Sequence, residues 1–116
     1  MTRGAWGEEL AAEYLLSQGY AIVARNFRTR FGELDIIAQK DGFLALVEVK
    51  LRKNMRYGAA CEAVGAAKQK KLVLAAEEWL GLHPTSFQPR FDVIEVYLPD
   101  GLNSPTIHHL KNAFDA

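Results

Sequence analysis

The sequence has a single cysteine, Cys61, so the chain can form no disulfide within itself and offers no cluster of thiolates for zinc. It also has no apolar run that approaches the length of a transmembrane helix. Near its start, Arg3, Glu8 and Glu9 interrupt the apolar residues, unlike the pattern of a signal peptide. These absences lead us to expect a cytoplasmic protein with no membrane partner.

The sequence has no excess of charge of either sign, because 14 Lys and Arg residues balance 14 Asp and Glu residues. The overall charge therefore gives no indication of a nucleic-acid partner. No internal repeat, low-complexity segment or linker divides the chain. With 116 residues, 49% of them hydrophobic, we expect a single domain over residues 1–116 with one core.

A β-hairpin is the clearest local feature. Residues 32–37 and 46–50 both alternate apolar or β-branched residues with charged ones, as strands do. Between them lies Asp41-Gly42, the strongest short-range signal for a hairpin turn. If this pair is the tip, residues that face each other across the hairpin have numbers that sum to 83, so Asp35 faces Glu48.

Alternation predicts that four charged side chains, Glu33, Asp35, Glu48 and Lys50, share one face of this hairpin. Like charges on directly opposed residues repel, so Asp35 opposite Glu48 requires a partner. A hard divalent cation held by oxygen ligands, with Lys50 beside it, provides one. The alternative is a salt bridge between Lys50 and Glu33, but this would leave Asp35 and Glu48 uncompensated. We therefore favour a metal site.

Basic residues are concentrated around this hairpin: from Arg25 to Lys71 the sequence has eleven basic residues and five acidic ones. Three of those acids belong to the predicted metal site, so a bound cation would leave the region strongly positive. The alternative is a solvated surface balanced by the acids at both ends of the chain, and charge alone does not decide between them. If the partner is a nucleic acid, the basic residues that we expect at its phosphates are Arg25, Arg28, Arg30, Arg52, Lys53 and Lys68.

The remaining pattern predicts helices and strands around the hairpin. We expect helices over residues 2–18 and 66–80, ended by Gly19 and Gly81, and further strands over 20–27, 91–98 and 106–110. His83, His108 and His109 show no metal-ligand spacing and are expected at the surface or bonded to neighbours.

The direction in which the Glu8 side chain points has two interpretations. Glu8 is in helical register with Ala11, Ala12 and Leu15, so it points toward whatever this helix packs on. The alternative is a first-turn carboxylate favoured by the helix dipole, and periodicity alone favours that alternative.

The hairpin residues also resemble a known signature. Gly32-Glu33-Leu34-Asp35 followed by Val47-Glu48-Val49-Lys50 looks like the PD-(D/E)xK nuclease signature, with Leu34 in place of a proline that varies widely across that superfamily. Further stretches resemble the YraN-like family of small bacterial proteins, which is similar to the archaeal Holliday-junction resolvases: residues 4–8, Ala12, Tyr14-Leu15, residues 26–28 and residues 90–94. The resemblance spans nearly the whole chain. It implies an α/β (α+β) fold with a restriction-endonuclease-like αβββαβ core, in which helices flank a mixed central sheet.

The resemblance also implies roles for individual residues. Asp35 and Glu48 would bind Mg²⁺ or Mn²⁺, helped by the backbone carbonyl of Val49. Lys50 would orient the attacking water or stabilise charge on the reacting phosphorus group. Glu8 would complete the metal shell, directly or through water, which reverses the preference based on periodicity.

On this basis we expect a metal-dependent endonuclease that acts on DNA rather than RNA, with branched or structured DNA as the leading substrate. One alternative is a nucleic-acid-binding module on a nuclease scaffold with little or no activity. Another is a protein-interaction domain that keeps the site as a relic. A resolvase would need two symmetric sites, so a homodimer is an accompanying expectation.

Overall fold

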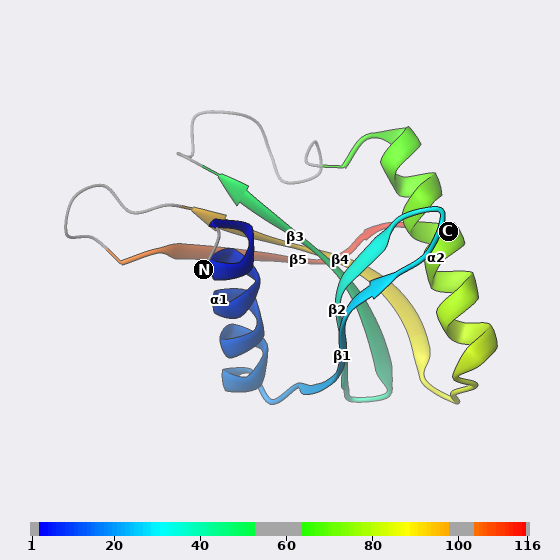
Figure 1. Cartoon of the computed structure of the whole chain (residues 1–116). Coiled ribbons are helices and arrows are strands. Elements are labelled where there is room, and N and C mark those ends of the chain that lie inside the picture. Colours follow the sequence, from blue (N-terminus) through cyan, green and yellow to red (C-terminus); the bar gives the residue numbers. More distant parts are fainter. Residues whose placement is uncertain (1–2, 53–63, 98–103, 116) are drawn as a thin grey trace.

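The computed structural model describes residues 3–52, 64–97 and 104–115, which form two helices and five strands (Figure 1). In chain order the elements are α1 (Arg3–Ser17), β1 (Ala21–Arg28), β2 (Glu33–Lys40), β3 (Phe43–Arg52), α2 (Ala66–Leu82), β4 (Gln88–Tyr97) and β5 (Thr106–Phe114). The expected order of the first six elements is confirmed. The last strand, predicted over 106–110, is present and continues to Phe114.

The five strands form one mixed sheet in the order β1-β2-β3-β4-β5. All neighbours are antiparallel except β3 and β4, which are parallel and are connected through α2. Parallel neighbours need such a long crossover, whereas β2 and β3 need only a tight turn. With helices on both faces of the sheet, the predicted class, a mixed central sheet flanked by helices, is confirmed (Figure 1).

The tight turn has the predicted register. Ile36 pairs with Val47 and Lys40 pairs with Phe43, so facing residues do sum to 83. Asp41 has a φ of 52° and Gly42 a φ of 82°, the two positive values that a type I′ turn requires. The Asp-Gly pair therefore sets which residues of β2 and β3 face each other.

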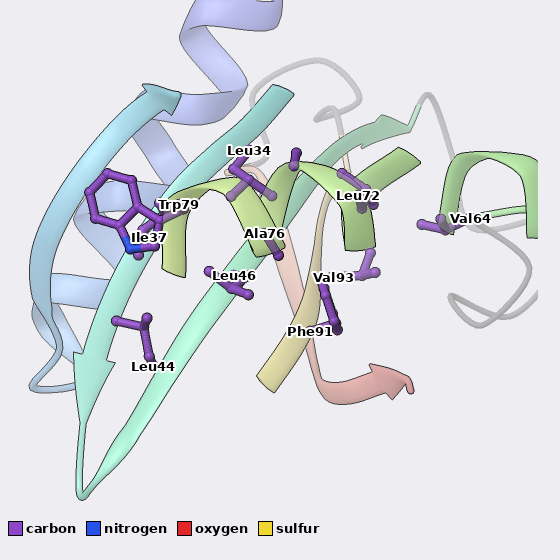
Figure 2. Packing of buried hydrophobic residues seen from close by; sticks show 11 residues of the cluster. Leu34, Ile37, Leu44, Leu46, Val64, Leu72, Ala76, Trp79, Phe91 and Val93 are labelled. Carbon is purple, nitrogen blue, oxygen red and sulfur yellow. The ribbon is translucent and has the colours of Figure 1, made fainter. Parts of the chain in front are cut away.

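One face of the sheet packs on α2. The helix presents an apolar stripe at helical spacing toward the sheet, as Figure 2 shows for Leu72, Ala76 and Trp79. Burying a side chain as large as leucine stabilises the fold by about 1.5–3 kcal/mol, so this stripe fixes the position of α2. The sheet residues beneath it include Leu34, Ile37, Leu44, Leu46, Phe91 and Val93.

The opposite face of the sheet packs on α1. Ala11, Ala12 and Leu15 are buried there, as their spacing predicts. The sheet contributes Ile36, Ala38, Ala45, Val47, Ile94 and Val96 to this second cluster. Among the described residues the buried side chains thus form two clusters, one on each side of the sheet, where the composition had led us to expect one core.

The helix ends differ in part from the prediction. We expected Gly81 to end the second helix, but α2 continues through Gly81 to Leu82, and the backbone N–H of His83 donates to the carbonyl of Trp79. The ring of His83 stacks on Trp79 with centroids 3.6 Å apart, which supports the continuation of the helix beyond the glycine. For the first helix, the expected starting residue Thr2 lies outside the described residues. None of the described helices is long and apolar enough to cross a membrane.

Candidate active site

The candidate site lies where β2 begins and β3 ends. The paired ladder between these strands stops at Ile36 and Val47, and Asp35 and Glu48 are the next residues along it. Instead of a further backbone pair, Oδ2 of Asp35 accepts a hydrogen bond of 2.8 Å from the backbone N–H of Val49. The site is also at the carboxyl end of two parallel strands, β3 and β4, where open α/β sheets usually bind ligands.

Asp35 and Glu48 share the face of the sheet that α2 covers. Val47 packs in the opposite cluster with α1, so alternation turns Glu48 toward α2, where it contacts Lys68. Asp35 joins it there, because Lys68 also lowers the pKa of Asp35. The two carboxyl groups lie close enough to shift each other's pKa. The prediction that they are facing neighbours is confirmed.

The prediction that four charged side chains share this face is wrong for Glu33. Leu34 packs in the same cluster as Ile37, whereas Ile36 packs in the other, so strict alternation is broken between Leu34 and Ile36. At the same level of the sheet, Asn26 of β1 adopts a left-handed conformation with a φ of 53°, between the pairs Arg25–Ile36 and Phe27–Leu34. Glu33 contacts Arg28 at 3.4 Å rather than Lys50, so the alternative salt bridge between Lys50 and Glu33 is not present.

Glu48 is the more deeply buried carboxylate of the pair, with 6% of its surface exposed. Its Oε1 atom is 3.7 Å from the ammonium groups of both Lys50 and Lys68. Its Oε2 atom is buried and has no hydrogen-bond partner among the described residues. A buried carboxylate oxygen without a partner is unfavourable, so this atom has the capacity for a ligand that the chain does not supply.

The electrostatics of the pair favour a shared proton. Burial raises the pKa of Glu48 to about 7, with the nearby charge of Asp35 as the next cause, while Lys68 and Lys50 oppose the shift. Burial also raises the pKa of Asp35, against the Val49 N–H bond, which lowers it. Both shifts favour the protonated forms, so the pair holds its first proton to a higher pH than an isolated carboxyl group does.

These residues fit a hard divalent cation. Two carboxylates meet there, and one oxygen of Glu48 lacks a partner among the described residues. In an antiparallel ladder the N–H and C=O of one residue point toward the same neighbouring strand, so the carbonyl of Val49 faces the Asp35 side as its amide does. Over the part of the chain that the structure describes, no group of three or more His, Cys, Asp or Glu side chains is arranged to hold a metal. The oxygen ligands that the described chain offers at this site are thus the carboxylates of Asp35 and Glu48 and the carbonyl of Val49.

Glu8 lies at the edge of this site. Gly7 allows α1 to approach the sheet closely, since a Cβ added to it would lie 3.3 Å from the side chain of Leu51. Burial, Asp35 and Glu33, in that order, raise the pKa of Glu8, so its carboxylate is within electrostatic reach of the pair. With its amide nitrogen toward the carboxylates, Asn26 donates to Oε1 of Glu8 and of Glu33, both at 2.8 Å. The structure thus brings Glu8 near Asp35 through Asn26, a residue whose role the sequence did not reveal.

Most of the expected phosphate-binding residues are paired with carboxylates. Arg25 contacts Glu9 at 3.0 Å, Arg28 contacts Glu33, and Arg52 contacts Glu95 at 3.1 Å. Arg30 lies over the ring of Phe31, 4.8 Å from its centroid. Lys53 lies outside the described residues. Lys68 points from the first turn of α2 to Glu48, which explains why a cation occupies a helix end whose dipole opposes it.

A second buried polar cluster lies on the α1 side of the sheet around Asp92. This carboxylate receives two hydrogen bonds from Arg90, at 2.8 and 2.9 Å, and contacts Nε2 of His109 at 2.7 Å. Burial alone would raise the pKa of Asp92, but the bonds from His109, Arg90 and the Asn112 amide lower it. His109 also meets the hydroxyl of Tyr14 at 3.1 Å, so the expectation of a histidine bonded to its neighbours is confirmed for it.

The fold and the site define a small mixed α/β domain with a half-buried aspartate, a buried glutamate and two lysines at the carboxyl edge of its sheet. The chain belongs to a family described as "Uncharacterised protein family UPF0102", whose model matches residues 7–96. The expected kinship with the YraN-like proteins is confirmed at this level.

Similar proteins cover nearly the whole chain. A UPF0102 protein of Trichlorobacter lovleyi is 47% identical over 97% of this chain and 89% of its own length. One of Syntrophomonas wolfei is 46% identical, covering 96% of each chain. One of Symbiobacterium thermophilum is 48% identical over 97% of this chain and 96% of its own length.

Proposed function

We propose that this protein is a metal-dependent nuclease that hydrolyses phosphodiester bonds. The observation that carries the proposal is the pair of half-buried Asp35 and buried Glu48, with an oxygen of Glu48 that has no partner among the described residues and Lys50 beside it. The resemblance of these residues to the PD-(D/E)xK signature supports the same interpretation. Bringing two carboxylates together away from water is costly unless the arrangement serves a ligand.

Asp35, Glu48 and the carbonyl of Val49 are the groups that would hold Mg²⁺ or Mn²⁺, with Glu8 near enough to bind through water. The cation, when bound, would polarise a phosphate and lower the pKa of a water molecule. The Val49 N–H bond holds Asp35 in place before any ligand arrives, so the site requires little reorganisation.

Lys50 and Lys68 would serve the phosphate. Both ammonium groups lie 3.7 Å from the same oxygen of Glu48. With a cation at the carboxylates, both lysines would be able to bind phosphate oxygens. Lys50, on the strand itself, would orient the attacking water and stabilise charge that develops on the scissile phosphate.

DNA is the proposed substrate rather than RNA, with branched or structured DNA first, because the resemblance extends to the resolvases. A homodimer would accompany this function, since a junction has two strands to cut at symmetric positions. A cytoplasmic site of action agrees with this substrate.

The test is a cleavage panel of single-stranded, duplex and branched DNA and of RNA, each with Mg²⁺ and with Mn²⁺. We expect cleavage that EDTA abolishes and that is greatest on branched DNA. Asp35→Asn is the control, since it keeps the size of the side chain and removes a ligand. If the wild type binds DNA but cleaves nothing in the panel, the protein is a binding module on a nuclease scaffold.

A further inference from the structure

Glu95 is a buried carboxylate that the proposed reaction does not use. Only 1% of its surface is exposed. Both of its oxygens are bonded: Nε of Arg52 donates to Oε2 at 3.1 Å, and the hydroxyl of Tyr97 donates to Oε1 at 3.0 Å. Burying a carboxylate is costly, and its fixed geometry restricts the orientations of its partner. The residue that Glu95 holds in place is Arg52.

Arg52 extends from this buried anchor toward solvent, with 30% of its side chain exposed. A guanidinium has five N–H donors in a rigid fork. Glu95 takes the one on Nε, and among the described residues no hydrogen bond involves the four on the two terminal nitrogens. Such a fork matches the oxygens of a phosphate better than any other side chain does.

Arg52 follows Lys50 on the same face of β3. Two residues along a strand correspond to about 6.6 Å, a distance that places the two cations next to each other along an extended strand. Lys50 pairs with Glu95 in the parallel register of β3 and β4, so the anchor lies directly beside the candidate site. Beyond Val47, β3 pairs with β4 alone among the described strands, and on its other edge the amide of Val49 bonds the Asp35 carboxylate of the candidate site.

We propose that Arg52 binds the phosphate adjacent to the scissile one, and that Glu95 and Tyr97 position its guanidinium for this contact. The substrate is then a nucleic-acid strand that follows the outer end of β3, with one phosphate at Lys50 and the next at Arg52. This inference rests on the proposed nuclease function, because it takes Lys50 as the position of cleavage.

The first test is the binding of a fluorescent single-stranded DNA oligonucleotide to the full chain without added metal, over a range of salt concentrations. Arg52→Gln should weaken binding roughly ten- to a hundredfold. It should also lower the slope of log Kd against log salt by about one, because one phosphate contact is lost. Lys111→Gln is the matched control, since it removes the same charge from an exposed position of β5 and should leave the slope unchanged.

Glu95→Gln separates positioning from net charge. This change makes the protein more positive, so general attraction to DNA would strengthen binding. The proposal predicts weaker binding, because Arg52 loses its charged anchor. Glu95→Asp, which keeps the charge, should bind more tightly than Glu95→Gln. Arg52→Gln leaves Glu95 buried without its cation, which can unfold the protein. The double variant Arg52→Gln with Glu95→Gln removes that buried charge. It therefore gives a folded comparison if the single variant unfolds.

The second test uses DNA in which one phosphate is replaced by an uncharged methylphosphonate. The wild type should avoid cleaving the bond on one side of that position, which also shows the direction of the strand. Arg52→Gln should cleave with no such avoidance, and Lys111→Gln should behave like the wild type.

The outcomes are distinct. If Arg52→Gln binds with the wild-type affinity and slope, the proposal is overturned, whatever the cleavage panel shows. If the Arg52–Glu95 pair only joins β3 to β4, Arg52→Gln and Glu95→Gln would both lower thermal stability and leave the salt slope of DNA binding unchanged. This result also overturns the proposal. If the wild type cleaves nothing while Arg52→Gln lowers the slope, the Arg52 contact is supported and only the nuclease proposal fails.

Discussion

The carboxylate of Asp35 accepts a hydrogen bond of 2.8 Å from the backbone N–H of Val49, where a further pair of backbone groups would otherwise continue the ladder. The Asp35 side chain thus replaces a backbone hydrogen-bond acceptor, and the pairing of β2 with β3 ends where Asp35 and Glu48 lie. This bond stabilises the charged form of Asp35, whereas burial and the charge of Asp35 raise the pKa of Glu48, so the two acids differ before any ligand binds.

The first prediction concerns the stability of the metal-free protein against pH. Glu48 has a pKa of about 7 in the folded protein and 4.5 when unperturbed, so between these values the folded state binds more protons than the unfolded state. Stability should therefore be highest at the acidic end of this window and fall as the pH rises through about 7, by on the order of 2 kcal/mol. Urea unfolding at pH 5, 6, 7 and 8 with EDTA present measures it.

Glu48→Gln is the control for this prediction. The amide that replaces the carboxyl group is uncharged at every pH, so most of the loss of stability between pH 5 and pH 8 should disappear. The variant should also be the more stable protein at pH 8. Parallel curves for the two proteins would mean that the carboxylate pair does not cause the pH dependence.

The second prediction separates ligands of the metal from the residue that serves the phosphate. Asp35→Asn and Glu48→Gln should each abolish stabilisation by Mn²⁺ and cleavage, while DNA binding without metal stays the same or tightens because one negative charge is gone. Lys50→Met should keep the stabilisation by Mn²⁺ and lose cleavage by roughly a hundredfold or more. Thermal unfolding with and without millimolar Mn²⁺ checks the first part, and a wild type that gains no stability would contradict it.

Much of the fold could be predicted because local signals agree with the final contacts. The register of β2 and β3 follows from a two-residue turn with two positive φ angles, which few residues other than Asp-Gly accommodate, together with alternation on both sides. The helices follow from apolar stripes that really are buried. Asp35 opposite Glu48 is a direct consequence of that register.

The rest depends on contacts between distant residues. Leu34 packs on the α2 side, near the left-handed Asn26 of β1, and no periodicity within 33–37 reveals it. Arg52 and Glu95 are 43 positions apart, and only the parallel register of β3 and β4 brings them together. The residues next to an arginine in the sequence do not tell whether it binds a phosphate or a buried carboxylate such as Glu95.

The third prediction concerns Asn26. A side chain with a β-carbon is strained at a φ of 53°, by about 1–2 kcal/mol for residues other than Gly, Asn and Asp. Asn26→Ala adds this strain to the loss of the bonds to Glu8 and Glu33, whereas Asn26→Gly loses only the bonds. The alanine variant should therefore be the less stable of the two by about 1 kcal/mol, as measured by urea unfolding.

Asn112 provides the control for that comparison, because it has the same φ of 53° and an exposed side chain. The difference between its alanine and glycine variants gives the cost of the backbone conformation alone. If Asn26→Gly is as stable as the wild type, the amide of Asn26 contributes nothing and does not position Glu8.

The fourth prediction concerns the Asp92 cluster. Asp92→Ala leaves Arg90 and His109 buried without their carboxylate, so it should lower the free energy of unfolding by about 3–5 kcal/mol. Arg25→Ala breaks a pair whose side chains are 33% and 45% exposed, and should cost less than about 1 kcal/mol. Denaturant unfolding measures the free energy of unfolding of both variants. Equal losses in the two would mean that the Asp92 cluster stabilises the fold no more than a surface ion pair does.

The last prediction concerns Lys68, which lowers the pKa of Glu48 from the first turn of α2. Removing its charge with Lys68→Met takes away that opposition, so the pKa of Glu48 should rise further above 7 and the loss of stability with pH should move to a higher pH. Lys70→Met, two residues later and exposed, is the matched control and should leave the midpoint unchanged. Titration of the Glu48 carboxyl by NMR in both variants, without metal, measures the two shifts directly.

A midpoint that moves equally in both variants would show that Lys68 acts through net charge and not through its contact with Glu48. A shift in Lys68→Met alone would show that α2 controls the charge of the carboxylate pair, and cleavage by this variant should then decline below the pH at which Glu48 loses its proton.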